Sequence, residues 1–150
     1  MIILNVVVAL ILALIAVYFD YSSYKIPNLL NLIAVCVSLV LILTEHFLHC
    51  PINLFENIVC AVAVFFITYL VYTVGGIGAG DVKLLFSLGL LLGGEIKQVF
   101  VFSMIAAGII GAVEVALKKS VVVNSDFGFK VHRIHFAYAI LTGLIISIIF

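Results

Sequence analysis

Two aspartates, Asp20 and Asp81, stand at the ends of long apolar segments and have the side chains best suited to chemistry in this chain. Two carboxylates that face each other cannot both ionise cheaply, so such a pair shares one proton. The ionised carboxylate can draw a proton from water, while the protonated one polarises an amide carbonyl. The pair would therefore suit hydrolysis of a peptide bond, provided that the fold brings the two residues together.

The composition determines which elements can position them. Hydrophobic residues make up 67% of the 150 residues and charged residues 9%, and the mean hydropathy is +1.47, whereas a soluble domain is about a quarter charged. The apolar runs approach the ~20 residues that cross a bilayer core of about 30 Å, and they lack the alternation of barrel strands. Because a spanning backbone must satisfy its own hydrogen bonds, we expect an all-α fold, a polytopic membrane helical bundle.

Six apolar segments are expected to form transmembrane helices. They run over Ile2–Phe19, Leu29–Phe47, Leu54–Val74, Val82–Leu92, Val99–Leu117 and His135–Phe150. The fourth is short, because two glycines interrupt it after about 11 residues, which span about 16 Å as a helix. We expect a single transmembrane domain over residues 1–150. We also expect the first segment to be a permanent span rather than a removed signal peptide, because no Lys or Arg precedes that segment.

Basic residues predict the orientation of these helices. The loops after the first, third and fifth segments hold Lys25, Lys83, Lys118, Lys119, Lys130 and Arg133, whereas the other loops hold only Lys97. Under the positive-inside rule the first group of loops faces the cytoplasm and both termini lie outside. Asp20 and Asp81 then share the cytoplasmic face, whereas Glu45 and Glu56 belong to an outer loop.

Two other interpretations of the aspartates stay open on this topology alone. Each could be an interfacial residue at a helix end, above all Asp81, because an acid is favourable at a helix N-terminus. Ionisable groups near membrane spans favour function in general. The same acids could therefore serve a small proton- or ion-coupled carrier instead of a hydrolase.

The surroundings of both aspartates resemble a known family. Asp81 closes the run Gly78-Ala79-Gly80-Asp81 and is followed by Val82-Lys83-Leu84-Leu85. This sequence resembles the GxGD motif of type IV prepilin peptidases, which are membrane aspartyl proteases. Asp20, with Lys25-Ile26-Pro27-Asn28 after it, resembles the first motif of that family.

The resemblance implies an aspartic endopeptidase with Asp20 and Asp81 as its catalytic pair. Such an enzyme removes a short, positively charged leader from prepilin or pseudopilin precursors at the cytoplasmic face of the inner membrane. Larger members carry a domain with paired C-x-x-C motifs that methylates the new N-terminus. This chain lacks those motifs and resembles the short peptidase-only form of tight-adherence (Flp-type) pili, so no methyltransferase activity and no cofactor are expected. Its partners would be the precursors and the lipid bilayer. Because its net charge is zero, the chain has no positive electrostatic field that would attract nucleic acid.

Five residues around the motifs are candidates for support or substrate binding. Gly78 and Gly80 remove side chains where an extended substrate backbone would approach, and they permit positive φ. Pro27 fits the first turn of the second helix. Asn28 would cap that helix, or orient a neighbour or the substrate. Lys83 would reach toward the headgroups, bind an acidic group of the substrate, or lower the first pKa of the aspartate pair.

A weaker likeness to the family opens the last segment, over residues 133–140. Relatives usually have a proline near its start, where this chain has His135 and Tyr138. Just before the fifth loop, Glu114 and Lys118 have the i,i+4 spacing of a structural ion pair.

No metal site is expected. The cysteines Cys36, Cys50 and Cys60 form no C-x-x-C pair. His46, His49 and Cys50 lie on the expected outer side, away from the aspartates, and lack the H-E-x-x-H arrangement of a zinc protease.

Overall fold

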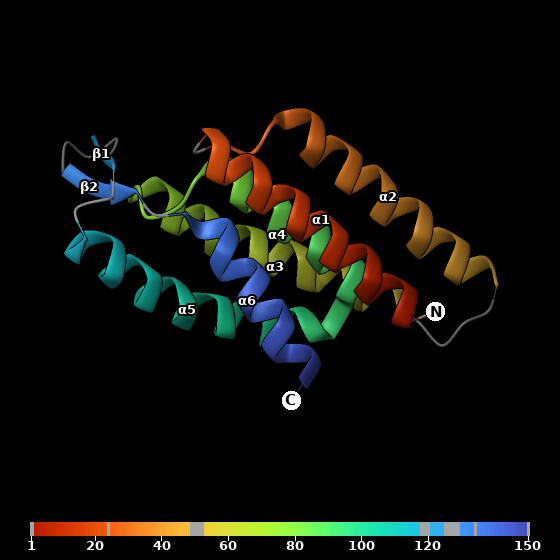
Figure 1. The fold of residues 1–150 in the computed structure, drawn as a ribbon. Helices are drawn as coiled ribbons and strands as arrows, with labels where there is room; N and C mark the ends of the chain where they lie inside the picture. Colours follow the sequence, from red (N-terminus) through yellow and green to blue (C-terminus); the bar gives the residue numbers. More distant parts are fainter. Residues whose placement is uncertain are drawn as a thin grey trace.

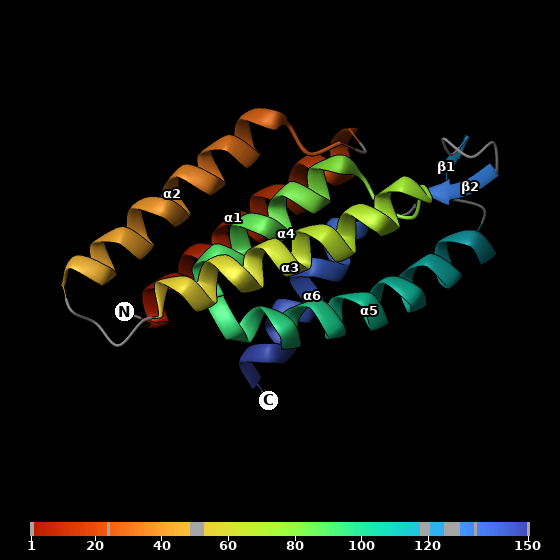
Figure 2. The ribbon, with the colours of Figure 1, turned by 180° about the vertical axis from the view of Figure 1, so that it is seen from behind.

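The computed structural model describes residues 2–23, 25–48, 53–117, 121–124, 130–133 and 135–149. In chain order the elements are α1 (Ile2–Ser23), α2 (Asn28–Phe47), α3 (Leu54–Thr73), α4 (Ala79–Leu92), the 3₁₀ turn η1 (Gly93–Glu95), α5 (Ile96–Ala116), β1 (Val121–Asn124), β2 (Lys130–Arg133) and α6 (Phe136–Ile149). The expected helical membrane bundle is confirmed. Figures 1 and 2 show the helices gathered along one long direction, with α2 at the outer side of the bundle.

Four stretches of the described chain are long and apolar enough to cross a membrane. They are α1, α2, α3 and the run from α4 to α5. At 14 residues, α6 is apolar but shorter. The protein is therefore a multi-pass membrane protein, while the number of six spans stays a prediction.

A two-stranded antiparallel hairpin joins α5 to α6. Val121 pairs with Arg133, and Asn124 pairs with Lys130. From its sequence this region is predicted to be a basic loop, so the hairpin is a difference from the prediction. The hairpin lies at the end of the bundle where α6 begins (Figure 1).

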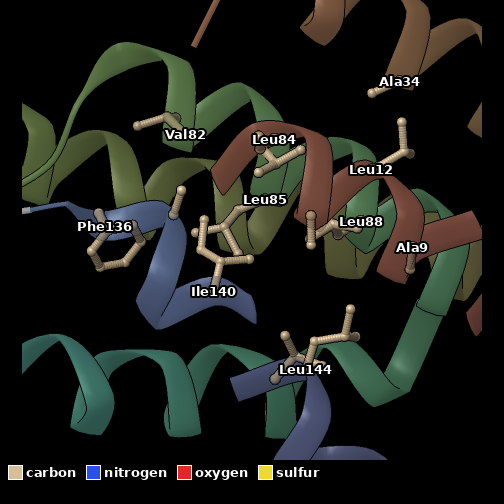
Figure 3. Close-up of a cluster of buried hydrophobic side chains, with 14 of the residues drawn as sticks. Ala9, Leu12, Ala34, Val82, Leu84, Leu85, Leu88, Phe136, Ile140 and Leu144 are labelled. Atoms are coloured by element: carbon tan, nitrogen blue, oxygen red, sulfur yellow. The ribbon is translucent and has the colours of Figure 1, made fainter. Parts of the chain in front are cut away.

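The core of the bundle is built around α4, which packs against α1, α2 and α3. Leu84, Leu85 and Leu88 of α4 are fully buried and form one cluster with Leu12 of α1 and Ile140 of α6 (Figure 3). Most of α4 is buried, and in its first turn Asp81 and Val82 are buried while Ala79 is exposed.

The fourth helix is short because the chain turns at Gly93, which has a φ of 55°. A side chain there would also collide with Asn57 of α3. The Asn57 amide donates to the carbonyl oxygen of Leu90 at 2.9 Å, which satisfies one of the carbonyls left open at a helix C-terminus. The expected break after the fourth segment is therefore present, and α4 begins at Ala79 instead of Val82.

Glu45 is not in an outer loop, as we had expected, but within α2. It is fully buried, and its Oε2 accepts a hydrogen bond of 3.0 Å from the Asn5 side-chain amide of α1. The same amide donates to the carbonyl oxygen of Leu91 at 3.3 Å. These contacts compensate part of the cost of burying a carboxyl group, and they join three helices.

Candidate active site

Three helix ends meet at one end of the bundle. The C-terminal end of α1 and the N-terminal ends of α4 and α6 lie there together in both views (Figures 1 and 2). Asp20 belongs to the last turn of α1 and Asp81 to the first turn of α4. Both aspartates are buried, with 5% and 6% of their surface exposed. Buried carboxylates at one end of a membrane bundle need specific partners.

A backbone amide orients the carboxylate of Asp81. Its Oδ2 accepts a hydrogen bond of 3.0 Å from the N–H of Gly78, the residue that caps α4. The Gly78 carbonyl in turn accepts the N–H groups of Asp81 and Val82, at 3.1 Å and 3.3 Å. An acid in this position also interacts favourably with the helix dipole. The GxGD sequence therefore forms a helix start that fixes the Asp81 side chain.

A backbone amide from a different helix contacts Asp20. The N–H of Ala137, in the first turn of α6, lies 3.3 Å from Asp20 Oδ2 and donates to it. The first amides of a helix have no partner within the helix, so the start of α6 is a natural site for a carboxylate. The sequence placed Asp20 at the end of a span but gave no sign that α6 would orient it.

The two motifs touch through Ile26 and Gly80. Ile26 is buried, and a Cβ added to Gly80 would lie only 2.8 Å from the Ile26 Cβ and 3.2 Å from its carbonyl oxygen. Glycine at position 80 thus lets the segment before α2 approach the residue next to Asp81. Gly78 has an extended backbone conformation with a φ of −83°, and in the described chain only Gly75 and Gly93 have a positive φ.

A second contact between the motifs joins Lys83 to Asn28. The Lys83 ammonium donates to Asn28 Oδ1 at 2.9 Å, so this lysine is bound to a neighbouring helix. Asn28 is the first residue of α2 and does not cap it. Pro27 stands one position earlier than expected, as the N-cap residue, without a side-chain cap.

The start of α6 is held by a second carboxylate, that of Glu114 in α5. Its Oε1 lies 2.9 Å from His135 Nδ1, and its Oε2 accepts the His135 backbone N–H at 3.4 Å. The expected pair of Glu114 with Lys118 involves a lysine outside the described residues. His135, in place of the usual proline, therefore connects α5 to α6 just before the amide that contacts Asp20, and sequence reasoning missed this role.

Metal-binding side chains do not gather in the part of the chain that the structure describes, where no three His, Cys, Asp or Glu residues form a group able to hold an ion. His49 and Cys50 lie outside the described residues.

Fold and site together define a class, that of polytopic helical membrane proteins with two buried, amide-oriented aspartates at one end of the bundle. A model of the type IV leader peptidase family matches residues 7–115. The chain therefore belongs to this family and is a membrane peptidase, as the motifs predicted. The matched range contains both Asp20 and Asp81 and ends before α6. No curated protein and no solved structure matched the chain.

Proposed function

We propose that this protein is an aspartic endopeptidase that removes the leader from type IV prepilin-like or pseudopilin precursors at the cytoplasmic face of the inner membrane. Its catalytic residues are Asp20 and Asp81. The observation that carries the proposal is that both carboxylates are buried at one end of the bundle, and that each accepts a hydrogen bond from a backbone amide of a helix start.

In this mechanism the two carboxyl groups share one proton. The ionised group takes a proton from a water molecule, whose oxygen attacks the scissile carbonyl, while the protonated group donates to the carbonyl oxygen. Collapse of the tetrahedral intermediate breaks the C–N bond, and a proton passes to the leaving amine. The amides of Gly78 and Ala137 fix the orientation of the carboxylates in advance, so little reorganisation is needed during the reaction. Because the pair titrates as a unit, neither residue is assigned as the base.

The position of the site agrees with a precursor anchored in the membrane. The distribution of Lys and Arg favours a cytoplasmic position for the end of the bundle with Asp20 and Asp81. A hydrophobic pilin helix can stay in the bilayer there, while its short basic leader extends into the cytoplasm. Hydrolysis alone is proposed, because the chain has no paired C-x-x-C motif.

Co-expression with a small pilin precursor tests the proposal, with processing followed by gel shift and mass of the product. The parent protein should shorten the precursor, and Asp20→Asn and Asp81→Asn should each abolish the shift. Glu95→Gln is the matched control, because Glu95 is an exposed acid at the other end of α4. Undiminished processing by both aspartate variants would refute the catalytic pair.

The same variants separate hydrolysis from transport. In proteoliposomes without substrate, a carrier that uses Asp20 and Asp81 would show proton flux that disappears in the Asn variants. The proposed peptidase should show no such flux, and its purified form should cleave the precursor.

A further inference from the structure

A stripe of buried polar side chains runs along α2. Asn31, Ser38 and Glu45 are spaced by seven residues, about two helical turns, and therefore lie on one face of the helix. All three are almost completely buried, with exposures of 2%, 0% and 0%. This face packs mainly against α4. Buried polar groups in a membrane bundle are expected to have hydrogen-bond partners.

Two of the three side chains have such partners. Ser38 Oγ donates to the carbonyl oxygens of Ala34 and Ser87, at 2.7 Å and 3.1 Å, and so contacts α4 directly. Glu45 accepts the amide of Asn5, as described above. Ser38 and Glu45 therefore have structural roles in joining α2 to its neighbours.

Asn31 differs from both, because neither its amide nitrogen nor its amide oxygen has a hydrogen-bond partner among the described residues. A carboxamide without partners in a buried position destabilises the folded protein. An apolar side chain of similar size would remove that cost. The amide at this position therefore needs an explanation other than stability.

The register of α2 on α4 places Asn31 near the candidate active site. One turn before it, Asn28 accepts a hydrogen bond from Lys83, and two turns after it, Ser38 donates to the Ser87 carbonyl. Asn31 thus lies beside the turn of α4 that follows Asp81.

We propose that Asn31 binds a backbone peptide group of the substrate close to the scissile bond; this inference rests on the proposed function. A carboxamide offers a donor and an acceptor side by side, which complements the N–H and C=O of an extended peptide. A simple cation or anion would use only one of the two. Holding the peptide in this way positions the scissile carbonyl against the carboxylates.

The substrate reaches Asn31 when α2 separates transiently from the first turns of α4, and α2 then closes again, so that the contact of Ile26 with Gly80 is re-formed before hydrolysis. Both views show α2 at the outer side of the bundle (Figures 1 and 2), and its contacts are mainly with α4. Opening of one peripheral element around a substrate is a common step in enzymes with enclosed sites.

The test compares Asn31→Leu with Ser38→Ala in the purified full-length protein, using cleavage of a pilin precursor and thermal unfolding in detergent. Asn31→Leu should lower kcat/KM about ten- to hundredfold, which corresponds to two net hydrogen bonds, and should leave Tm unchanged or raise it. Ser38→Ala should lower Tm and keep kcat/KM near that of the parent. Asn31→Thr, whose hydroxyl can donate and accept, should give an intermediate kcat/KM.

Precursor peptides with a single backbone amide replaced by an ester identify the bound group. With the ester at the bound position, Asn31→Leu should lower kcat/KM by a smaller factor than it does with the all-amide peptide. The reason is that the ester has already weakened the hydrogen bonding between the peptide and Asn31. The inference is overturned if Asn31→Leu lowers Tm, or if it leaves kcat/KM unchanged while the parent cleaves and Asp20→Asn does not. If the parent cleaves no precursor, or Asp20→Asn cleaves as well as the parent, it is the proposed function that fails.

Discussion

The backbone amide of Ala137 donates a hydrogen bond to Oδ2 of Asp20 across 3.3 Å and so connects the first helix of the chain to the last. The family match ends at residue 115, yet α6 contributes this contact to the candidate site. Two residues earlier, His135 is held by both oxygens of Glu114. The position of the Ala137 amide therefore depends on the pair that His135 forms with Glu114.

Glu114 should act as a positioning residue for Asp20 through α6. Glu114→Leu removes two hydrogen bonds at the start of α6, so we expect the free energy of unfolding to fall by about 1–3 kcal/mol. We also expect kcat to fall more than KM rises, because the proposed catalytic carboxylate of Asp20 loses its orientation. Glu114→Gln, which keeps an acceptor oxygen, should recover much of the activity. Thermal unfolding and steady-state cleavage measure both effects, and equal activity of Glu114→Leu at temperatures far below Tm would contradict the role.

The contact between Lys83 and Asn28 should couple the two motifs in activity more than in stability. Because the pair is exposed, it should contribute less than about 1 kcal/mol to folding. Lys83→Met and Asn28→Leu should each lower kcat/KM about three- to tenfold, and the double variant should lose no more than the worse single variant. Lys97→Met, at an exposed lysine in the first turn of α5, is the control. Additive losses in the double variant would show that the two residues act independently.

Much of the fold could be predicted because the hydropathy of a segment indicates whether it lies in the lipid bilayer or in water. The limits of the helices agree with the apolar runs to within a few residues, and the start of α4 differs by three. The hairpin was missed because basic residues dominated the interpretation of that loop, although the β-branched run Val121–Val123 and the turn residues after Asn124 carry a strand signal.

The parts of the site that could not be predicted are contacts between distant segments. The distribution of charges along the chain predicted Glu45 in an outer loop, whereas its burial in α2 depends on Asn5, which is forty residues away in the sequence. The burial of Asn31 and its lack of partners depend on how α2 is placed on α4, which no local pattern encodes. Sequence motifs identified Asp20 and Asp81 as candidates, whereas the amides that orient them come from the three-dimensional arrangement of helix starts.

Gly80 should be required for its small size rather than for an unusual backbone conformation. In Gly80→Ala the new Cβ would meet the Ile26 Cβ at 2.8 Å, and overpacking of this kind costs about 1–3 kcal/mol. The segment before α2 would have to move away from Asp81, so cleavage should fall together with stability. Ile26→Gly in the same chain should restore part of both, because it removes the Ile26 Cβ that the new Cβ would meet, although the Ile26 carbonyl stays close.

Gly108→Ala in α5 is the matched control for this change. A Cβ there would meet no atom within 4 Å, so the substitution should stabilise the helix by about 0.5–1 kcal/mol and leave cleavage unchanged. Circular dichroism melts and cleavage rates of the three variants separate a steric role of Gly80 from a general effect of adding alanine. If Gly80→Ala behaved like Gly108→Ala, the close approach of Ile26 to the GxGD motif would not matter for the active site.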